Sequence, residues 1–201
     1  MGFAIPTIQN TKGKIVNTSK ISTYTKCGND VRQIADNLIE LYYPAIKKYG
    51  VTIDYLFAHA AVDENGELKG DAIKLNGYPC SGLAHIIGLK DRVAGRADAE
   101  IIIDGDKWEF MPDDERAALV DHELNHFIVP INGHGIADTD DSGRPKLKMR
   151  KHDVQVGWFS IIAQRHALAS SEVQQALGMV KNYRQSVFFF LNDAEDASSV
   201  E

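Results

Sequence analysis

The pattern His122-Glu123-Leu124-Asn125-His126 constrains this 201-residue chain more than any other feature of its sequence. Residues four apart in an α-helix lie on one face, one turn apart, so a helix here lets two imidazoles bind the same metal ion. Glu123 would then lie beside the ion without being a ligand, in a position suited to a general base. The pattern predicts a helical metal site, and Zn²⁺ is the expected ion because imidazole suits it and hydrolysis needs no redox chemistry.

The residues around this pattern predict a helix without any reference to the histidines. Pro112 suits a first helical position, and the acidic residues 113–115 suit the positive end of a helix dipole. Apolar side chains then form one stripe at helical spacing, at Ala117, Val120, Leu124 and Phe127. Pro130 ends the helix. The two histidines lie off the centre of the stripe, so packing through the stripe leaves their rings accessible.

The residues before the motif helix predict one helix and three strands. The helix spans 31–49, and Pro44 inside it should kink or split it. The strands have the length and apolar pattern of sheet segments, at 51–57, 83–89 and 99–104, and a polar connection separates the last two. These elements, with strands and helices in one chain, predict an α+β fold.

The residues after the motif helix predict a hairpin and two more helices. The hairpin spans 132–151 and turns at 140–143. One helix spans 153–166, and Ser170 or Ser171 caps the other, which runs to about Tyr183. For the whole chain we expect a loosely ordered arm or short edge strand over 1–28, one domain over 29–191, and an acidic disordered tail over 192–201.

A zinc site needs a third protein ligand, and several residues downstream of the motif qualify. His152 is favoured because it follows the hairpin, which returns the chain to the motif helix. His134, Asp153 and Glu172 stay open as alternatives. Asp153 also suits a helix cap or a partner that orients a metal-binding histidine. We consider His134 and Arg150 for contacts to a transition state.

Composition and charge limit the partners of this chain. The formal net charge is −6, so the protein as a whole is not attracted to nucleic acid or anionic membranes. A local exception is predicted for Arg144, Lys146, Lys148 and Arg150, which alternate along one predicted strand. Their shared face suits DNA contact, or else the protection of an edge strand by charge. No apolar run approaches the ~20 residues of a membrane span, and two cysteines with no paired spacing favour a reducing, cytoplasmic location.

Three segments of the sequence resemble the phage metallopeptidase family, which is distantly similar to SprT-like zinc proteases. They are 99–108, 116–126 and 143–154, and the resemblance as a whole covers about residues 51–168. It implies a zincin-like fold, in which a small twisted sheet, mixed or antiparallel, packs on the active-site helix with further helices beside it. An edge strand of this sheet lines the cleft. It also implies that His152 joins His122 and His126 as a ligand, with Asp153 completing a His-Asp pair and Glu123 as the catalytic residue.

These observations lead to one main hypothesis and two alternatives. The main hypothesis is a zinc metallopeptidase of phage or prophage origin that acts on protein or peptide substrates in the host cytoplasm. One alternative is a zinc-stabilised protein that binds DNA or a host defence factor and catalyses nothing. The other is a DNA-associated, SprT-like protease that uses the basic residues between 144 and 150. The metal site is common to all three, so the role of Glu123 decides between catalysis and binding.

Overall fold

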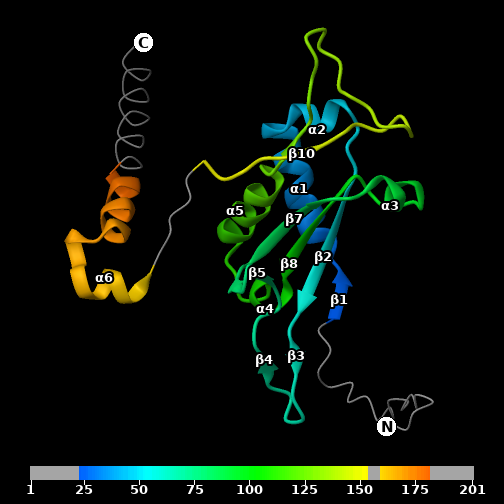
Figure 1. Ribbon diagram of the computed structural model, residues 1–201. Coiled ribbons are helices and arrows are strands. Elements are labelled where there is room, and N and C mark those ends of the chain that lie inside the picture. Colours follow the sequence, from blue (N-terminus) through cyan, green and yellow to red (C-terminus); the bar gives the residue numbers. More distant parts are fainter. Residues whose placement is uncertain (1–22, 154–158, 182–201) are drawn as a thin grey trace, which may run out of the picture. The chain divides into compact units, whose positions relative to one another are not determined.

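A computed structural model describes residues 23–153 and 159–181 of the chain (Figure 1). Contacts between Cα atoms divide the chain into a unit that ends at Lys151 and a second unit that begins at His152. The predicted acidic tail and residues 1–22 of the predicted arm lie outside the described residues. None of the helices described is both long enough and apolar enough to span a membrane.

The first unit is an α+β fold, as predicted, built on a mixed four-stranded sheet in the order β1-β2-β8-β7. The strands are β1 (Thr23–Lys26), β2 (Ile53–His59), β8 (Ala99–Asp104) and β7 (Gly82–Ile86). β2 and β8 are parallel, and the two outer strands pair antiparallel to them. Residues 23–26 of the predicted arm therefore form an edge strand, and β7 forms the opposite edge.

Helices and short hairpins surround this sheet. The helices of the first unit are α1 (Asn29–Tyr42), α2 (Pro44–Lys48), α3 (Leu89–Val93), α4 (Gly105–Trp108) and α5 (Asp113–Leu124). The short strands pair two by two: β3 (Ala61–Val62) with β4 (Leu68–Lys69), β5 (Lys74–Leu75) with β6 (Tyr78–Pro79), and β9 (Phe127–Ile128) with β10 (Lys148–Met149).

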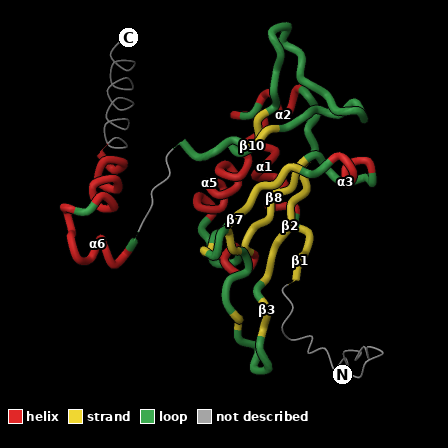
Figure 2. Tube along the Cα trace, in the orientation of Figure 1, coloured by secondary structure: helices red, strands yellow, loops and turns green. Residues whose placement is uncertain are grey.

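The core lies between one face of the sheet and the helices α1 and α5, which run along the same side of it (Figure 2). Strand β8 places alternate residues on this face, and Ala99, Ile101 and Ile103 are fully buried there. The register aligns Ile101 with Tyr55 on one side and Ala84 on the other. Helices α1 and α5 complete the core with a buried pair each, Val31 and Ala35, and Val120 and Leu124. Burial of these apolar side chains fixes α5 against the sheet.

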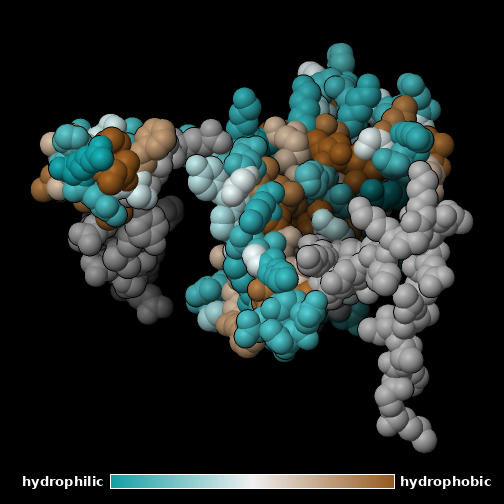
Figure 3. Space-filling view, turned by 60° about the horizontal axis from the view of Figure 1, so that its bottom comes forward, coloured by the Kyte–Doolittle hydropathy of each residue, from teal (hydrophilic) through white to brown (hydrophobic). Residues whose placement is uncertain are grey.

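The opposite face of the sheet is less deeply covered. Leu56, Ile102 and Leu83 stand next to one another in register on this face, and each is only partly buried. From the side shown in Figure 3, apolar side chains interrupt the mainly hydrophilic surface of the first unit. The more completely buried face is therefore the one that carries α5.

Several predicted elements differ from the structure at their ends. Pro44 splits the first predicted helix into α1 and α2, which is one of its two predicted effects, and it lies at the first position of α2. Strand β7 ends at Ile86, three residues earlier than predicted, and part of the predicted polar connection forms α3. Strand β8 has the predicted bounds. Errors of this kind arise at element ends, where tertiary packing outweighs local propensity.

The second unit holds short helices in its described part. They are α6 (Ser160–His166), the 3-10 turn Ala167–Ala169, and a helix from 171 to at least 181. Ser170 caps the last helix, as predicted, because its hydroxyl accepts a hydrogen bond from the Val173 amide at 3.3 Å. α6 begins at Ser160 rather than at 153, and residues 154–158 of the predicted helix lie outside the described residues.

Candidate metal centre

The three side chains of the motif, at the end of α5, differ in how deeply they are buried. Val120 and Leu124, four residues apart, point into the core and are fully buried. Glu123 is also buried, with 4% of its surface exposed, whereas His122 is exposed and His126 is intermediate. α5 ends at Leu124, and its last turn tightens as the His126 amide donates to the Glu123 carbonyl oxygen at 3.3 Å. The pattern predicted from the sequence is therefore helical up to Leu124, and His126 lies in the turn that follows.

Three imidazoles come together beside this turn. His122, His126 and His152 each offer one ring nitrogen, and these atoms all lie within 4.8 Å of one another. The rings of His122 and His126 meet edge to face, with 5.1 Å between their centroids. Three neutral imidazoles are a donor set that suits zinc and leaves a coordination position open. The spacing allows one ion to bind all three.

A backbone carbonyl orients the His126 ring. Its Nδ1 lies 2.8 Å from the carbonyl oxygen of Arg150, which can only accept a hydrogen bond. Nδ1 is therefore the protonated nitrogen, and Nε2 carries the lone pair that a metal needs. The Arg150 amide donates in turn to the His126 carbonyl at 2.7 Å. This pair of bonds ties the end of α5 to the segment that leads to His152.

Glu123 packs against the edge strand β7. A Cβ built on Gly82 would lie 2.5 Å from Glu123 Oε1 and 3.0 Å from its Cγ, so only glycine leaves room for this carboxylate. Burial raises the pKa of Glu123 to about 7, and the nearby His126 acts in the opposite direction. The carboxylate is thus held in a fixed, poorly hydrated position between α5 and β7.

A buried network of charges holds the hairpin between 138 and 146. Arg92 of α3 forms ion pairs with Asp98 and with Asp140, and donates to the Pro145 carbonyl oxygen at 2.9 Å. Arg144 reaches the same Asp98 at 2.8 Å. Asp98 is 1% exposed, and hydrogen bonds from Thr52 and the two arginines outweigh the effect of burial and lower its pKa. The hairpin is therefore fastened to the ends of β2 and β8 before the chain reaches β10 and His152.

The prediction that four basic residues share one face of a strand is wrong. Strand β10 covers only Lys148 and Met149 and pairs with β9, and Arg144 lies in the ion-pair network instead. Arg150 donates to the Asn125 side chain at 3.1 Å, on the α5 side. The turn predicted at 140–143 is confirmed by a Gly143 amide that donates to the Asp140 carbonyl oxygen at 2.9 Å. The four cations consequently do not line one strand.

The histidine cluster does not include the other residues considered as ligands. His134 is exposed in a turn where its amide donates to the Asn132 side chain at 2.9 Å, and the cluster does not include it. Glu172 is buried within the second unit and does not belong to the cluster either. Asp153 is exposed, and α6 does not begin there, so its role as a cap or as an orienting partner stays a prediction.

Two features of the site were not predicted. One is Gly82, although an isolated glycine in a strand pattern is a known signal of close backbone approach. The other is Asp121, which accepts a hydrogen bond from the Tyr43 hydroxyl at 2.5 Å. Nothing in the local sequence joins two residues that are 78 positions apart, so only the packing of α1 on α5 reveals this contact.

Comparison with protein families agrees with this geometry. Residues 23–181 match the model of a family described as "Putative phage metallopeptidase", and the match spans the sheet, α5 and the histidine cluster. A search of curated proteins and a search of solved structures each returned no match. The matched residues make up most of the chain, from β1 into the last described helix. The chain belongs to this family of phage metallopeptidases.

Proposed function

We propose that this protein is a zinc-dependent peptidase whose metal is held by His122, His126 and His152. The observation that carries the proposal is the convergence of three imidazoles beside a single buried carboxylate. The family implies a metal, and the donor set supports zinc because all three ligands are nitrogen atoms. The hydrogen bond from His126 Nδ1 to the Arg150 carbonyl is the kind of outer contact that strengthens such a ligand. When bound, zinc supplies a water of lowered pKa and polarises a substrate carbonyl.

Glu123 has the position and environment of the proton carrier. Its carboxylate accepts a proton from the attacking water at Oε1 or Oε2 and then delivers it to the leaving amine. Its contact with Gly82 restricts where those oxygens can lie, and restriction of a reacting group is worth a large factor in rate. The same contact excludes water from one side of the carboxylate.

The edge strand β7 is the proposed docking strand for the substrate. It is the last strand in the sheet order and pairs with β8 alone within that sheet. An extended peptide that adds to this edge would run past Gly82, against which Glu123 packs. Main-chain hydrogen bonds would then supply affinity that is largely independent of the peptide sequence.

The test compares wild type with Glu123→Gln and His122→Ala, using zinc content and cleavage of peptides as the two measurements. Glu123→Gln keeps the shape of the side chain but cannot accept a proton, so we expect full zinc content and turnover lower by about 10³-fold. His122→Ala should lose both zinc and turnover. A chelator should inactivate wild type, and added zinc should restore it.

The same experiment distinguishes a non-catalytic protein. If zinc only stabilised a binding surface, Glu123→Gln would leave every measured property unchanged, and His122→Ala would unfold the chain or abolish binding. Unaltered peptide cleavage by metal-loaded Glu123→Gln would exclude the proposed mechanism.

A further inference from the structure

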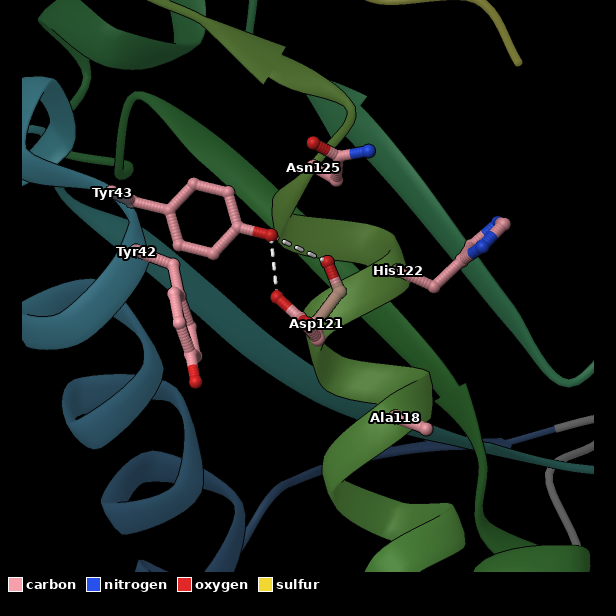
Figure 4. A pocket seen from close by; sticks show the side chains of 6 residues that line it. All are labelled: Tyr42, Tyr43, Ala118, Asp121, His122 and Asn125. Atoms are coloured by element: carbon pink, nitrogen blue, oxygen red, sulfur yellow. Dashed lines mark hydrogen bonds between the residues drawn. The ribbon is translucent and has the colours of Figure 1, made fainter. Parts of the chain in front are cut away.

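A pocket lies against α5 on the side that faces α1, next to the histidine cluster (Figure 4). Its volume is about 460 Å³. Its walls come from the end of α1 and from successive turns of α5, and the lining residues are Tyr42, Tyr43, Ala118, Asp121, His122 and Asn125. Because His122 is both a wall residue and a proposed metal ligand, a side chain in this pocket belongs to a peptide residue close to the bond that is cleaved.

The pocket carries one negative charge in a fixed place. The Tyr43 hydroxyl lies 2.5 Å from Asp121 Oδ1 and 2.9 Å from the Asp121 carbonyl oxygen, and Figure 4 shows it pointing at both. A phenol donates to one carboxylate oxygen and leaves the charge of the group in place. Within the part of the chain that the structure describes, no lysine or arginine forms an ion pair with Asp121.

Aromatic surface stands beside this carboxylate. Tyr42 is 63% exposed and lines the same pocket, so a ligand can reach its ring. A cation is attracted to an aromatic face, and a carboxylate beside it adds a Coulombic attraction. Asp114 is exposed and lies one helical turn before Ala118, on the same side of α5, which extends the negative potential along the approach to the pocket.

From these observations we propose that the pocket binds a basic side chain of the peptide substrate, lysine or arginine. The proposal rests on the proposed peptidase function, and it adds the class of substrate. The charge that recognises the side chain is that of Asp121, the aromatic wall is Tyr42, and Tyr43 positions the carboxylate.

A second, adjoining pocket limits where the basic residue can bind. It shares Tyr42, Tyr43 and Asn125 with the first pocket, and Arg150 is among its other lining residues. The Arg150 guanidinium donates to Asn125 Oδ1 at 3.1 Å and so lies close to the boundary between the two pockets. A basic side chain is repelled in the second pocket, because Arg150 is part of its wall, so the preference is confined to the first pocket.

The experiment uses zinc-loaded full-length protein and short peptides in which lysine or norleucine occupies each position in turn. Norleucine has the four-carbon chain of lysine and lacks its terminal ammonium, so the ratio of the two measures recognition of the ammonium group. Cleavage is measured with wild type, and binding by fluorescence polarisation is measured with Glu123→Gln, which does not turn the peptide over. At one position we expect lysine to be preferred over norleucine by about tenfold in both measurements.

Variants then assign the preference to the pocket. Asp121→Asn still accepts the Tyr43 hydrogen bond but lacks the charge, so the ratio should fall to about three, the part that the Tyr42 ring supplies. Tyr42→Ala should lower the ratio by about threefold, whereas Tyr42→Phe, which keeps the ring, should preserve it. Glu64→Gln removes an equal charge from an exposed turn and is the matched control, with the ratio unchanged. Zinc content is measured for every variant. If Asp121→Asn loses zinc, the comparison of Tyr42→Ala with Tyr42→Phe tests the proposal instead.

The outcomes separate this inference from the proposed function. Cleavage by wild type with no preference for lysine at any position would overturn the inference and leave the peptidase function standing. A ratio that Asp121→Asn, with its zinc retained, does not change would also overturn it. No cleavage and no binding of any peptide by zinc-loaded protein would overturn both.

Discussion

The two segments that supply the proposed metal ligands are held in different ways. His122 and His126 come from the end of α5 and its following turn, and their relative position depends on the helix itself. His152 arrives after a hairpin that begins beyond Pro130 and is fastened by Arg92, Asp98, Asp140 and Arg144. The difference shows that one half of the site is local and the other half depends on contacts between residues that are distant in the sequence.

The two segments are also held by different interactions: α5 by apolar burial, and the hairpin by apolar burial together with buried charges. Val120 and Leu124 attach α5 to the core through nonpolar contact. The hairpin contributes Ala137 to that core, but its fixed position also depends on buried ions. A buried ion pair is sensitive to the loss of one partner, since the remaining charge is then left without compensation. The hairpin should therefore be the more easily disturbed half of the site.

The largest effect is expected from His152→Ala, which removes the proposed ligand that follows the hairpin. Loss of an outer-shell partner already lowers metal affinity by about 10- to 100-fold, so loss of a ligand should exceed about 100-fold and abolish turnover. Zinc affinity measured by competition with a chelator checks this. The control is His134→Ala, in the turn where the His134 amide donates to the Asn132 side chain. This variant should bind zinc as the wild type does. Equal affinities for the two variants would remove His152 from the site.

The next largest effect is expected from Asp98→Ala, which leaves Arg92 and Arg144 without their shared carboxylate. Removal of one partner of a buried pair costs about 3 kcal/mol in the free energy of unfolding. Urea denaturation measures this, and hydrogen exchange should show faster opening across 138–151 than across α5. Asp141→Asn, at an exposed position of the same turn, should change stability by less than about 0.5 kcal/mol. Uniform loss of protection in both segments would show that α5 and the hairpin open together.

A smaller effect is expected from Gly82→Ala, which tests whether α5 alone determines the position of Glu123. The added Cβ would lie 2.5 Å from Glu123 Oε1, so the carboxylate must move. A displacement of about 1 Å can cost about 100-fold in rate, and we expect turnover lower by about 10- to 100-fold with zinc content unchanged. Normal turnover would mean that β7 does not restrict this side chain.

The smallest effect is expected from the ionisation of Asp98, whose pKa in the folded protein is lowered. Its stabilising contribution is complete well above the unfolded pKa of about 3.9, and it is lost as the pH falls through the lower folded value. Wild type should therefore lose stability below about pH 5, and the difference between wild type and Asp98→Asn should shrink over the same range. Denaturation midpoints measured between about pH 7 and pH 3 check this sign. A difference that grows toward acid would contradict the proposed ionisation.

Most of the first unit could be predicted from the sequence because its elements are regular and amphipathic. The helix around His122, strand β8 and the break at Pro44 all follow from local spacing or from the geometry of proline. The connection after β7 was predicted as polar coil, yet α3 forms there and places Arg92 against Asp98. The prediction of a basic face was wrong for a related reason. Alternation along a chain does not reveal whether a strand is continuous, or whether an arginine has a buried partner.

The sequence by itself determined the local half of the proposed centre, because an α-helix places residues four apart on one face wherever it forms. It also marked His152 as a ligand, but only among several choices and with the support of a family resemblance. Tertiary structure alone decided which distant histidine approaches the first two, which glycine makes room for Glu123, and which aspartate meets Tyr43. These three depend on where separate elements pack, and packing follows from the burial and charge of the whole chain rather than from any short pattern.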